Sequence, residues 1–159
     1  MAPGSPILAV LAPDLLGRAF SDAVCGRVVY LWRDGRLRPV VSRSLIAGYL
    51  RLWHGLGLSA TDRRRWGWWL TAADRAHFVP EDRPPPDSTR LLCERLALES
   101  GARHIIHGGS SAVSSDEPVS GPEPFRWRLA AEFLESLASM GQALNGRQAP
   151  PAGGPARAG

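Results

Sequence analysis

Ile7–Leu11 reads ILAVL, five apolar residues in a row, and Pro13 follows two positions later. A short unbroken apolar run that ends at a turn residue is typical of a strand buried on both faces, as strands of parallel sheets are. Working outward, we expect further strands over Leu37–Val41 (LRPVV), His77–Val79, His104–His107 (HIIH) and Phe125–Leu129 (FRWRL).

Segments with helical periodicity separate these strands. We expect helices over residues 15–20, 23–33, 43–54, 61–76, 89–100 and 131–144, with Asp14, Ser42 and either Asp87 or Ser88 as N-caps. Alternating strands and helices predict a mainly parallel sheet covered on both faces. The expected fold is therefore α/β, a three-layer α/β/α sandwich with about five strands.

The composition indicates one small domain. The chain has 159 residues, of which 44% are hydrophobic, and we expect a single domain over 1–145 with a disordered Pro/Gly/Ala-rich tail over 146–159. The apolar stretch near the N-terminus is too short for a signal peptide or a membrane span, so we expect no membrane association and a cytoplasmic location. Cys25 and Cys93 show no metal-type spacing and are interpreted as reduced core residues.

The positive charge comes entirely from arginine. All 19 basic residues are Arg, and the formal net charge is +4. A coding bias explains this composition, and so does phosphate recognition, because the guanidinium fork matches a phosphate with two hydrogen bonds. Composition alone does not separate the two explanations.

Ligands of parallel α/β sheets bind outside the carboxyl ends of the strands. In this chain that edge is formed by Ala12–Asp14, Ser42–Ser44, Arg83–Arg90 and His107–Ser111. His104 and His107 are three residues apart on one strand and so face opposite sides, which disfavours a shared metal ion. Ser110 and Ser111 lack the strand–turn–helix context of a serine nucleophile.

Three stretches of the chain match a family pattern in sequence and in order. The first is Leu31–Ser42 (LWRDGRLRPVVS) together with LIAGYLRLW, which starts at Leu45. The second and third are Ala97–Gly109 (ALESGARHIIHGG) and Phe125–Leu137 (FRWRLAAEFLESL). Together they resemble the PIN-domain family, and within it the VapC-like toxin components of toxin–antitoxin systems. The resemblance runs over about residues 7–140. It implies a parallel sheet between helices and a metal-dependent ribonuclease activity, in which carboxylates hold Mg²⁺ or Mn²⁺.

The chain departs from the family at the metal-binding positions. The family's carboxylates fall on Ala12, Gly48, Arg90 and Gly109, a further acid falls on Ser111, and the family's Asn falls on Asp14. Without carboxylate oxygens a divalent cation keeps its own water shell. We therefore expect a catalytically degenerate protein with no resident cofactor. Its former nuclease groove would bind RNA or another anion through Arg90, with Arg83 or Arg43 beside it.

Several alternatives stay open at this stage. A working Mg²⁺- or Mn²⁺-dependent ribonuclease would use relocated acids, and its candidate ligands are Asp14, Asp87, Asp116 and Glu117. Simpler interpretations are helix capping for the first two and a solvated loop for the last two. The resemblance also implies an antitoxin-like protein partner and a homodimer. An unrelated small α/β interaction domain is the remaining alternative.

The helix that starts at Thr61 carries three arginines, Arg63–Arg65, and then Trp66, Trp68 and Trp69. Basic residues mixed with aromatic residues are able to hold single-stranded RNA by charge and stacking. However, Trp66 and Trp69 are three apart and share one helix face, which predicts core or dimer packing for these two rings and an outward position for Trp68.

Overall fold

The computed structural model describes residues 4–109 and 124–148. The order of elements is β1 (Ile7–Leu11), α1 (Pro13–Arg18), α2 (Ala23–Arg33), β2 (Leu37–Val41), α3 (Arg43–Gly55), α4 (Ala60–Thr71), β3 (His77–Phe78), α5 (Thr89–Ser100), β4 (His104–His107), β5 (Arg126–Leu129) and α6 (Ala130–Gln148). The strands that the sequence predicts over 7–11, 37–41 and 104–107 are confirmed at both ends.

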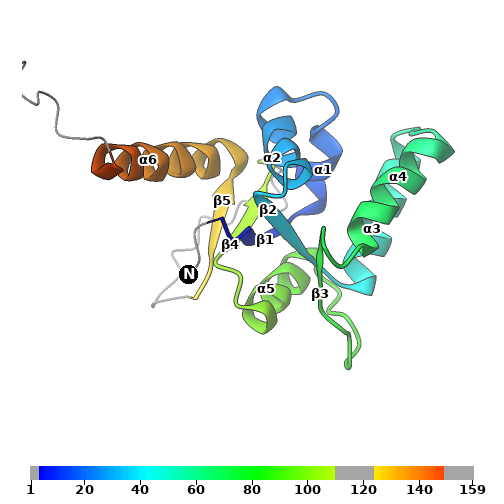
Figure 1. Cartoon of the computed structure of the whole chain (residues 1–159). Helices are drawn as coiled ribbons and strands as arrows, with labels where there is room; N and C mark the ends of the chain where they lie inside the picture. The colour runs from blue at the N-terminus through cyan, green and yellow to red at the C-terminus, as the bar shows by residue number, and fades with distance from the viewer. Residues whose placement is uncertain (1–3, 110–123, 149–159) are drawn as a thin grey trace, which may run out of the picture.

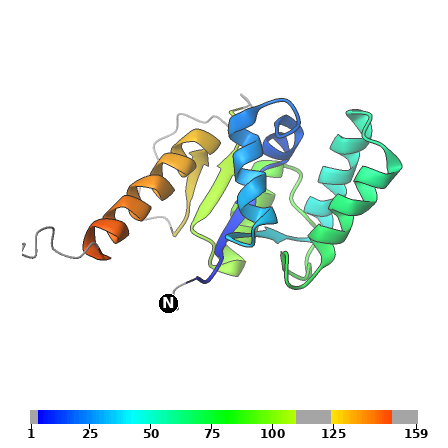
Figure 2. The same ribbon diagram turned by 45° about the horizontal axis from the view of Figure 1, so that its top comes forward.

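The five strands form one sheet in the order β3-β2-β1-β4-β5, and every neighbouring pair is parallel. In Figure 1, α1 and α2 lie above the sheet and α5 lies below it. Figure 2 shows the same layers turned, with α6 beside β5 and the α3–α4 pair at the opposite end of the molecule. The expected three-layer α/β/α sandwich with a parallel five-stranded sheet is confirmed.

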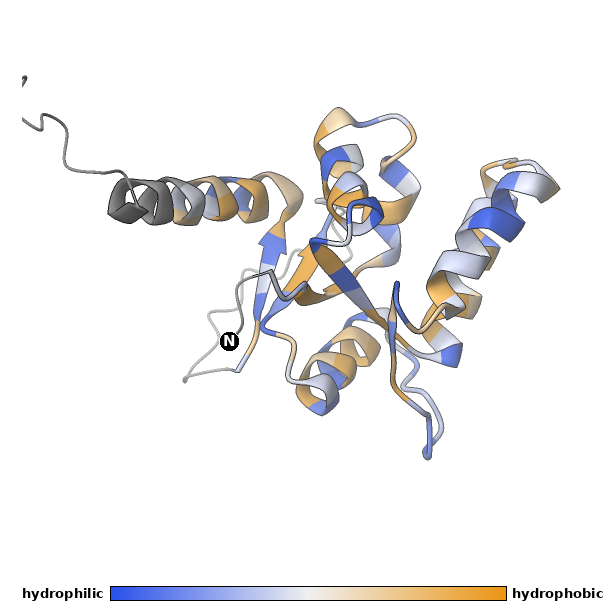
Figure 3. Cartoon of the chain, in the orientation of Figure 1, coloured by the Kyte–Doolittle hydropathy of each residue, from blue (hydrophilic) through white to orange (hydrophobic). Residues whose placement is uncertain are grey.

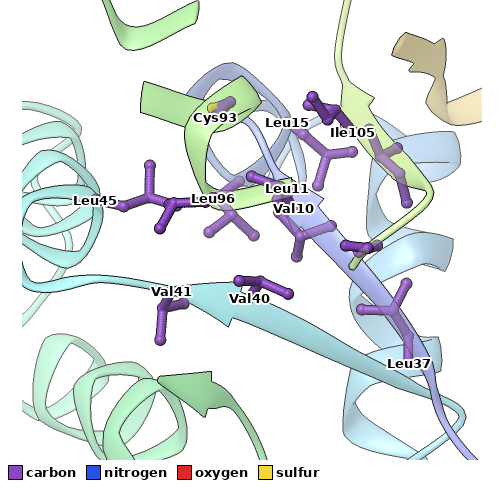
Figure 4. Packing of buried hydrophobic residues seen from close by; sticks show 14 of the residues in the cluster. Val10, Leu11, Leu15, Leu37, Val40, Val41, Leu45, Cys93, Leu96 and Ile105 are labelled. Carbon is purple, nitrogen blue, oxygen red and sulfur yellow. The ribbon is translucent and has the colours of Figure 1, made fainter. Parts of the chain in front are cut away.

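The core follows from the apolar strands. Val10 and Leu11 of β1 are fully buried, and Figure 4 shows them among Val40 of β2, Leu96 of α5 and Ile105 of β4. Both faces of β1 are covered, which explains its unbroken apolar sequence. Figure 3 shows the same distribution, with hydrophobic residues concentrated on the central strands and hydrophilic residues on the outer part of α4.

An aromatic cluster joins α4 to this core. Trp66 and Trp69 of α4 pack on Trp32 of α2, with ring centroids 5.5 and 5.7 Å away, whereas Trp68 is 61% exposed. The Nε1 atom of Trp32 donates to the carbonyl of Arg75 at 2.9 Å. The predicted packing of Trp66 and Trp69 against the core is confirmed, and both rings are half-buried.

Two helix ends differ from the sequence prediction by more than two residues. The helix expected over 61–76 ends at Thr71, because the chain turns at Ala72 toward β3. The final helix extends to Gln148, so it includes three residues of the segment 146–159 that we expected to be disordered. None of the described helices is both long enough and apolar enough to cross a membrane.

Candidate functional site

The chain reverses its direction of travel across the sheet between β1 and β4. From β1 it proceeds through β2 to β3, and then it returns to place β4 on the other side of β1. Such a switch point leaves a crevice outside the carboxyl ends of the two strands, where ligands of parallel sheets bind. Here the crevice begins at Ala12, whose N–H donates to the carbonyl of Ile106 at 2.9 Å, and at Gly108, which follows β4.

Asp14 connects the two strand ends at this switch point. Its Oδ2 atom accepts a hydrogen bond from the Gly108 N–H at 3.0 Å. The N-cap of α1 is Ala12, and no side chain caps this helix, so the interpretation of Asp14 as an N-cap is wrong. Its carboxylate accepts a hydrogen bond from a backbone donor 94 residues away in the sequence.

Gly108 is a position where a side chain does not fit without movement. A Cβ atom there would lie 3.0 Å from Cδ of Arg18 and 3.3 Å from both the carbonyl and Oδ2 of Asp14. The next residue, Gly109, has φ = +93°, a conformation that favours glycine. The two glycines let the chain turn closely over α1, and they bring two backbone N–H groups to the crevice.

His107 ends β4 beside this turn and is only 9% exposed. Its Nδ1 atom accepts from the Gly109 N–H at 3.1 Å, which assigns the proton of the neutral ring to Nε2. The ring packs edge-on against Trp127 with centroids 6.0 Å apart. Burial lowers the pKa of His107 and outweighs the opposing effect of Asp14 and Glu132, so this imidazole is neutral at pH 7.

Arg90 lies in the first turn of α5, where it is held by two contacts. Its Nε atom donates to Oε1 of Glu94 at 3.1 Å, and its Cζ atom lies 5.9 Å from the ring centroid of Trp127. The Nε1 atom of Trp127 donates to the same oxygen of Glu94 at 3.0 Å. The side chains of Arg90 and Glu94 are 29% and 24% exposed. Glu94 and Trp127 are site residues that the sequence reasoning missed.

A second acid that the sequence reasoning missed lies at the start of α3. Oε1 of Glu81 accepts from the Ser44 N–H at 2.9 Å, and Oε2 accepts from the Ser44 hydroxyl at 2.7 Å. Burial alone would raise the pKa of Glu81, but hydrogen bonds from Ser42 and Ser44, together with Arg43, lower it on balance. The protein thus supplies its own anion at the N-terminus of α3.

A cleft of about 250 Å³ lies between α3 and α5 on this edge. It is lined by Pro13, Ser44, Leu45, Ala47, Gly48, Arg51, Pro85, Pro86, Asp87, Thr89 and Leu92. Gly48 leaves open space, because a Cβ atom there would meet nothing within 4 Å. Asp87 is exposed on the cleft and is not the cap of α5, since the Ser88 hydroxyl accepts from the Leu91 N–H instead.

The arginines expected to share one groove are separated. Arg43 and Arg90 each lie in the first turn of a helix at the switch-point edge. Arg83 instead contacts the last turn of α5, where its Nη2 atom lies 3.0 Å from Oε1 of Glu99. Because α5 has 12 residues, its two ends are about 17 Å apart. Arg83 therefore does not act at the same point as Arg90.

The described residues do not fit a divalent cation at this edge. No group of three or more His, Cys, Asp or Glu side chains within 4–109 and 124–148 is arranged to hold a metal ion. Asp14 bonds to Gly108, and Oε1 of Glu94 accepts from two donors. The remaining candidate ligands, Asp116 and Glu117, lie outside the described residues.

Beneath the crevice, two protonated groups complete the packing. The Tyr49 hydroxyl donates to the carbonyl of Leu11 at the end of β1, and burial raises the pKa of Tyr49 well above its usual value. Burial also raises the pKa of Cys93 to about 12, and nearby Asp14 and Glu94 add to the effect. This thiol is protonated at neutral pH and is neither a ready nucleophile nor a metal ligand. Cys25 and Cys93 are both buried and free, as predicted.

Comparisons of this chain with protein-family models, with curated proteins and with solved structures gave no match.

Proposed function

We propose that this protein is a PIN-like domain that binds single-stranded RNA through the phosphate backbone at the switch-point edge and does not cleave it. One observation carries the proposal: α5 begins at this edge without an acid in its first turn, and it has an arginine there, Arg90. The N-terminus of a helix favours negative charge, so an arginine at this position is unfavourable for the isolated helix. A bound anion would offset that cost.

Arg90 is the residue best placed to meet a phosphate. Glu94 occupies its Nε atom, which leaves the Nη groups with four N–H donors for a ligand. Trp127 lies against the guanidinium and limits its rotation, so less side-chain entropy is lost when a ligand binds. The partial exposure of Arg90 makes it accessible to RNA at the protein surface.

Binding without cleavage follows from the lack of metal-binding carboxylates at this edge. Phosphodiester hydrolysis by the family's chemistry needs carboxylates that are free to hold a divalent cation. Here Ala12, Gly48 and Gly109 offer no carboxylate, and Arg90 brings the opposite charge. The neutral imidazole of His107 has its Nδ1 atom committed to Gly109, so it does not replace the missing metal ligands.

The test is a titration of a fluorescently labelled single-stranded RNA, followed by anisotropy. Arg90→Gln removes the charge and the fork and is expected to weaken binding about tenfold or more. Arg64→Gln is the matched control, because Arg64 is exposed on α4 and the charge change is the same. Equal affinities of the two variants would contradict the role of Arg90.

A second candidate function is favoured by a different surface. An apolar hollow of about 610 Å³ lies between α1, α2 and α4, and Phe20 and Tyr30 on it are 49% and 59% exposed. Arg33 and Arg65 also line it, and neither forms an ion pair within the part of the chain that the structure describes. The fitting occupant is a partner protein segment with an apolar side chain flanked by acids, which is the chemistry expected of an antitoxin-like partner.

This second function is tested with synthetic peptides. A peptide that carries a Leu-Trp pair flanked by Glu is expected to bind the protein, and Tyr30→Arg is expected to abolish binding by blocking the hollow. The same peptide with Lys in place of Glu serves as the charge control. Equal binding of the two peptides would contradict the role assigned to Arg33 and Arg65.

A further inference from the structure

A second cationic cavity lies at the opposite edge of the sheet, where β4 and β5 begin. It has a volume of about 480 Å³ and is lined by Gly101, Arg103, His104, Pro124, Phe125, Arg126 and Arg128. His104 pairs in register with Arg126, and Ile106 pairs with Arg128. Because residues two apart on a strand share a face, His104, Arg126 and Arg128 lie on the same side of the sheet.

The lining of this cavity contains three guanidinium groups and no described carboxylate. Within residues 4–109 and 124–148, none of Arg103, Arg126 and Arg128 forms an ion pair. Arg103 and Arg126 are exposed, and Arg128 is half-buried. Three like charges that gather around one cavity repel one another, and the repulsion is greater where burial lowers the effective dielectric constant.

Two atoms here are buried without a described hydrogen-bond partner: Nε of Arg128 and Nδ1 of His104. A buried polar atom that makes no hydrogen bond costs folding free energy, and a partly desolvated cation without a counter-charge costs more. The protein therefore carries an electrostatic cost at this place. An anion in the cavity would relieve it.

The cavity is held in shape by the backbone and by packing. The Arg126 N–H donates to the carbonyl of Arg103 at 2.9 Å, which fixes the start of β5 beside the start of β4. The His104 ring packs edge-on against Phe133 of α6 with centroids 5.3 Å apart. Gly101, with φ = +77°, caps the C-terminus of α5, and after it the chain continues along the wall of the cavity. The arginine backbones are thus positioned before any ligand arrives, which lowers the entropic cost of binding.

We propose that this cavity is a phosphate-binding site, formed by Arg103, Arg126 and Arg128 beside His104. Arginine suits this chemistry because its planar fork donates two parallel hydrogen bonds to phosphate oxygens. The site is on the opposite edge of the sheet from Arg90, so it goes beyond the function proposed above and does not depend on it.

His104 provides a local reporter of occupancy. Burial lowers its pKa, and the charges of Arg128 and Arg103 lower it further. Arg126 is the remaining charged residue of the cavity, and the facing residue of α6, Phe133, carries no charge. A phosphoryl anion among these groups favours the protonated imidazole, so binding must raise the pKa of His104. His107 lies at the other edge and serves as an internal control.

The experiment is a titration of the whole chain with inorganic pyrophosphate, followed by calorimetry and by NMR of the four histidines. We expect saturable binding and a raised pKa of His104, with the pKa of His107 unchanged. Arg126→Gln/Arg128→Gln should weaken binding at least tenfold, whereas Arg64→Gln should not. Because Arg128 is half-buried, Arg103→Gln/Arg126→Gln, which changes exposed residues only, provides a second variant that is expected to fold normally.

Competition identifies the source of the phosphate. If a single-stranded RNA without a terminal phosphate displaces pyrophosphate, the natural ligand is a phosphodiester chain; if only pyrophosphate binds, it is a small phosphorylated molecule. Either result supports the site. No binding of pyrophosphate or RNA at this edge, or binding that is unaffected by both double variants and leaves His104 unchanged, would overturn the proposal. Arg90→Gln tests the other edge separately, so the two proposals can fail independently.

Discussion

Replacing Asp14 measures how much this side chain contributes to the free energy of unfolding through its contact at the switch point. Asp14→Ala removes the acceptor of the Gly108 N–H bond, which has a length of 3.0 Å and connects α1 to the end of β4. Asp14→Asn keeps an oxygen in nearly the same place and removes only the charge. The pair of variants therefore separates the hydrogen bond from the electrostatic contribution.

The expected magnitudes follow from the type of bond. A hydrogen bond to a charged group contributes about 1.5–3 kcal/mol, and a neutral one contributes about 1 kcal/mol. We expect Asp14→Ala to lower the free energy of unfolding by about 2–3 kcal/mol and Asp14→Asn to lower it by about 1 kcal/mol. Asp14 makes more contacts than this single bond, so the value for the Ala variant is a lower bound.

Urea unfolding followed by tryptophan fluorescence is the assay, since the chain contains six tryptophans. With a urea dependence of about 2 kcal/mol per molar, the Ala variant should shift the midpoint by about 1 M and the Asn variant by about half as much. An Asn variant as unstable as the Ala variant would show that charge, and not the hydrogen bond to Gly108, holds the strand ends. An Ala variant of normal stability would refute the whole argument.

Three further predictions concern the two histidines of β4, Gly109 and Tyr49. The pKa values of His104 and His107 are both lowered in the folded protein. Their contribution to stability is therefore fully present above the unfolded pKa of 6.5 and is lost as the pH falls below it, by at most about 1.4 kcal/mol per pH unit per histidine. Unfolding curves at several pH values measure this loss, and a stability that rises on acidification would contradict it. Gly109→Ala places an alanine at φ = +93° and should lower the free energy of unfolding by about 1–2 kcal/mol, measured by thermal unfolding. Gly67→Ala, at a helical position with open space around it, is the control and should be neutral or stabilising in the same assay. Tyr49→Phe removes the buried hydroxyl that donates to the carbonyl at the end of β1 and should cost about 1–2 kcal/mol in urea unfolding, and an unchanged midpoint would count against that bond.

The sequence predicted the sheet well because its strands are buried on both faces. Ile7–Leu11 is apolar at every position, and that pattern depends on the local residues alone. The ends of helices were harder to predict where residues continue a helical pattern without forming a helix, as they do after Thr71.

The site was less predictable because its contacts join distant residues. Capping preferences are local, so Asp14 at the start of a helical stretch was interpreted as a cap, whereas its partner is Gly108. The same limitation applies to Arg83, which pairs with Glu99, 16 residues further along the chain. Of the contacts at Arg90, only the one with Glu94 had a signal in the sequence, because residues four apart on a helix are neighbours.

The most direct test of the central claim is to incubate a labelled single-stranded RNA with the purified protein and millimolar Mn²⁺ or Mg²⁺, and then to measure binding and RNA length in the same samples. The account predicts that the RNA is bound at full length, and that Arg90→Gln weakens binding while Arg64→Gln does not. Metal-dependent cleavage that is abolished by Asp14→Asn or Asp87→Asn would contradict the account, because it would show that the remaining acids form a working nuclease site.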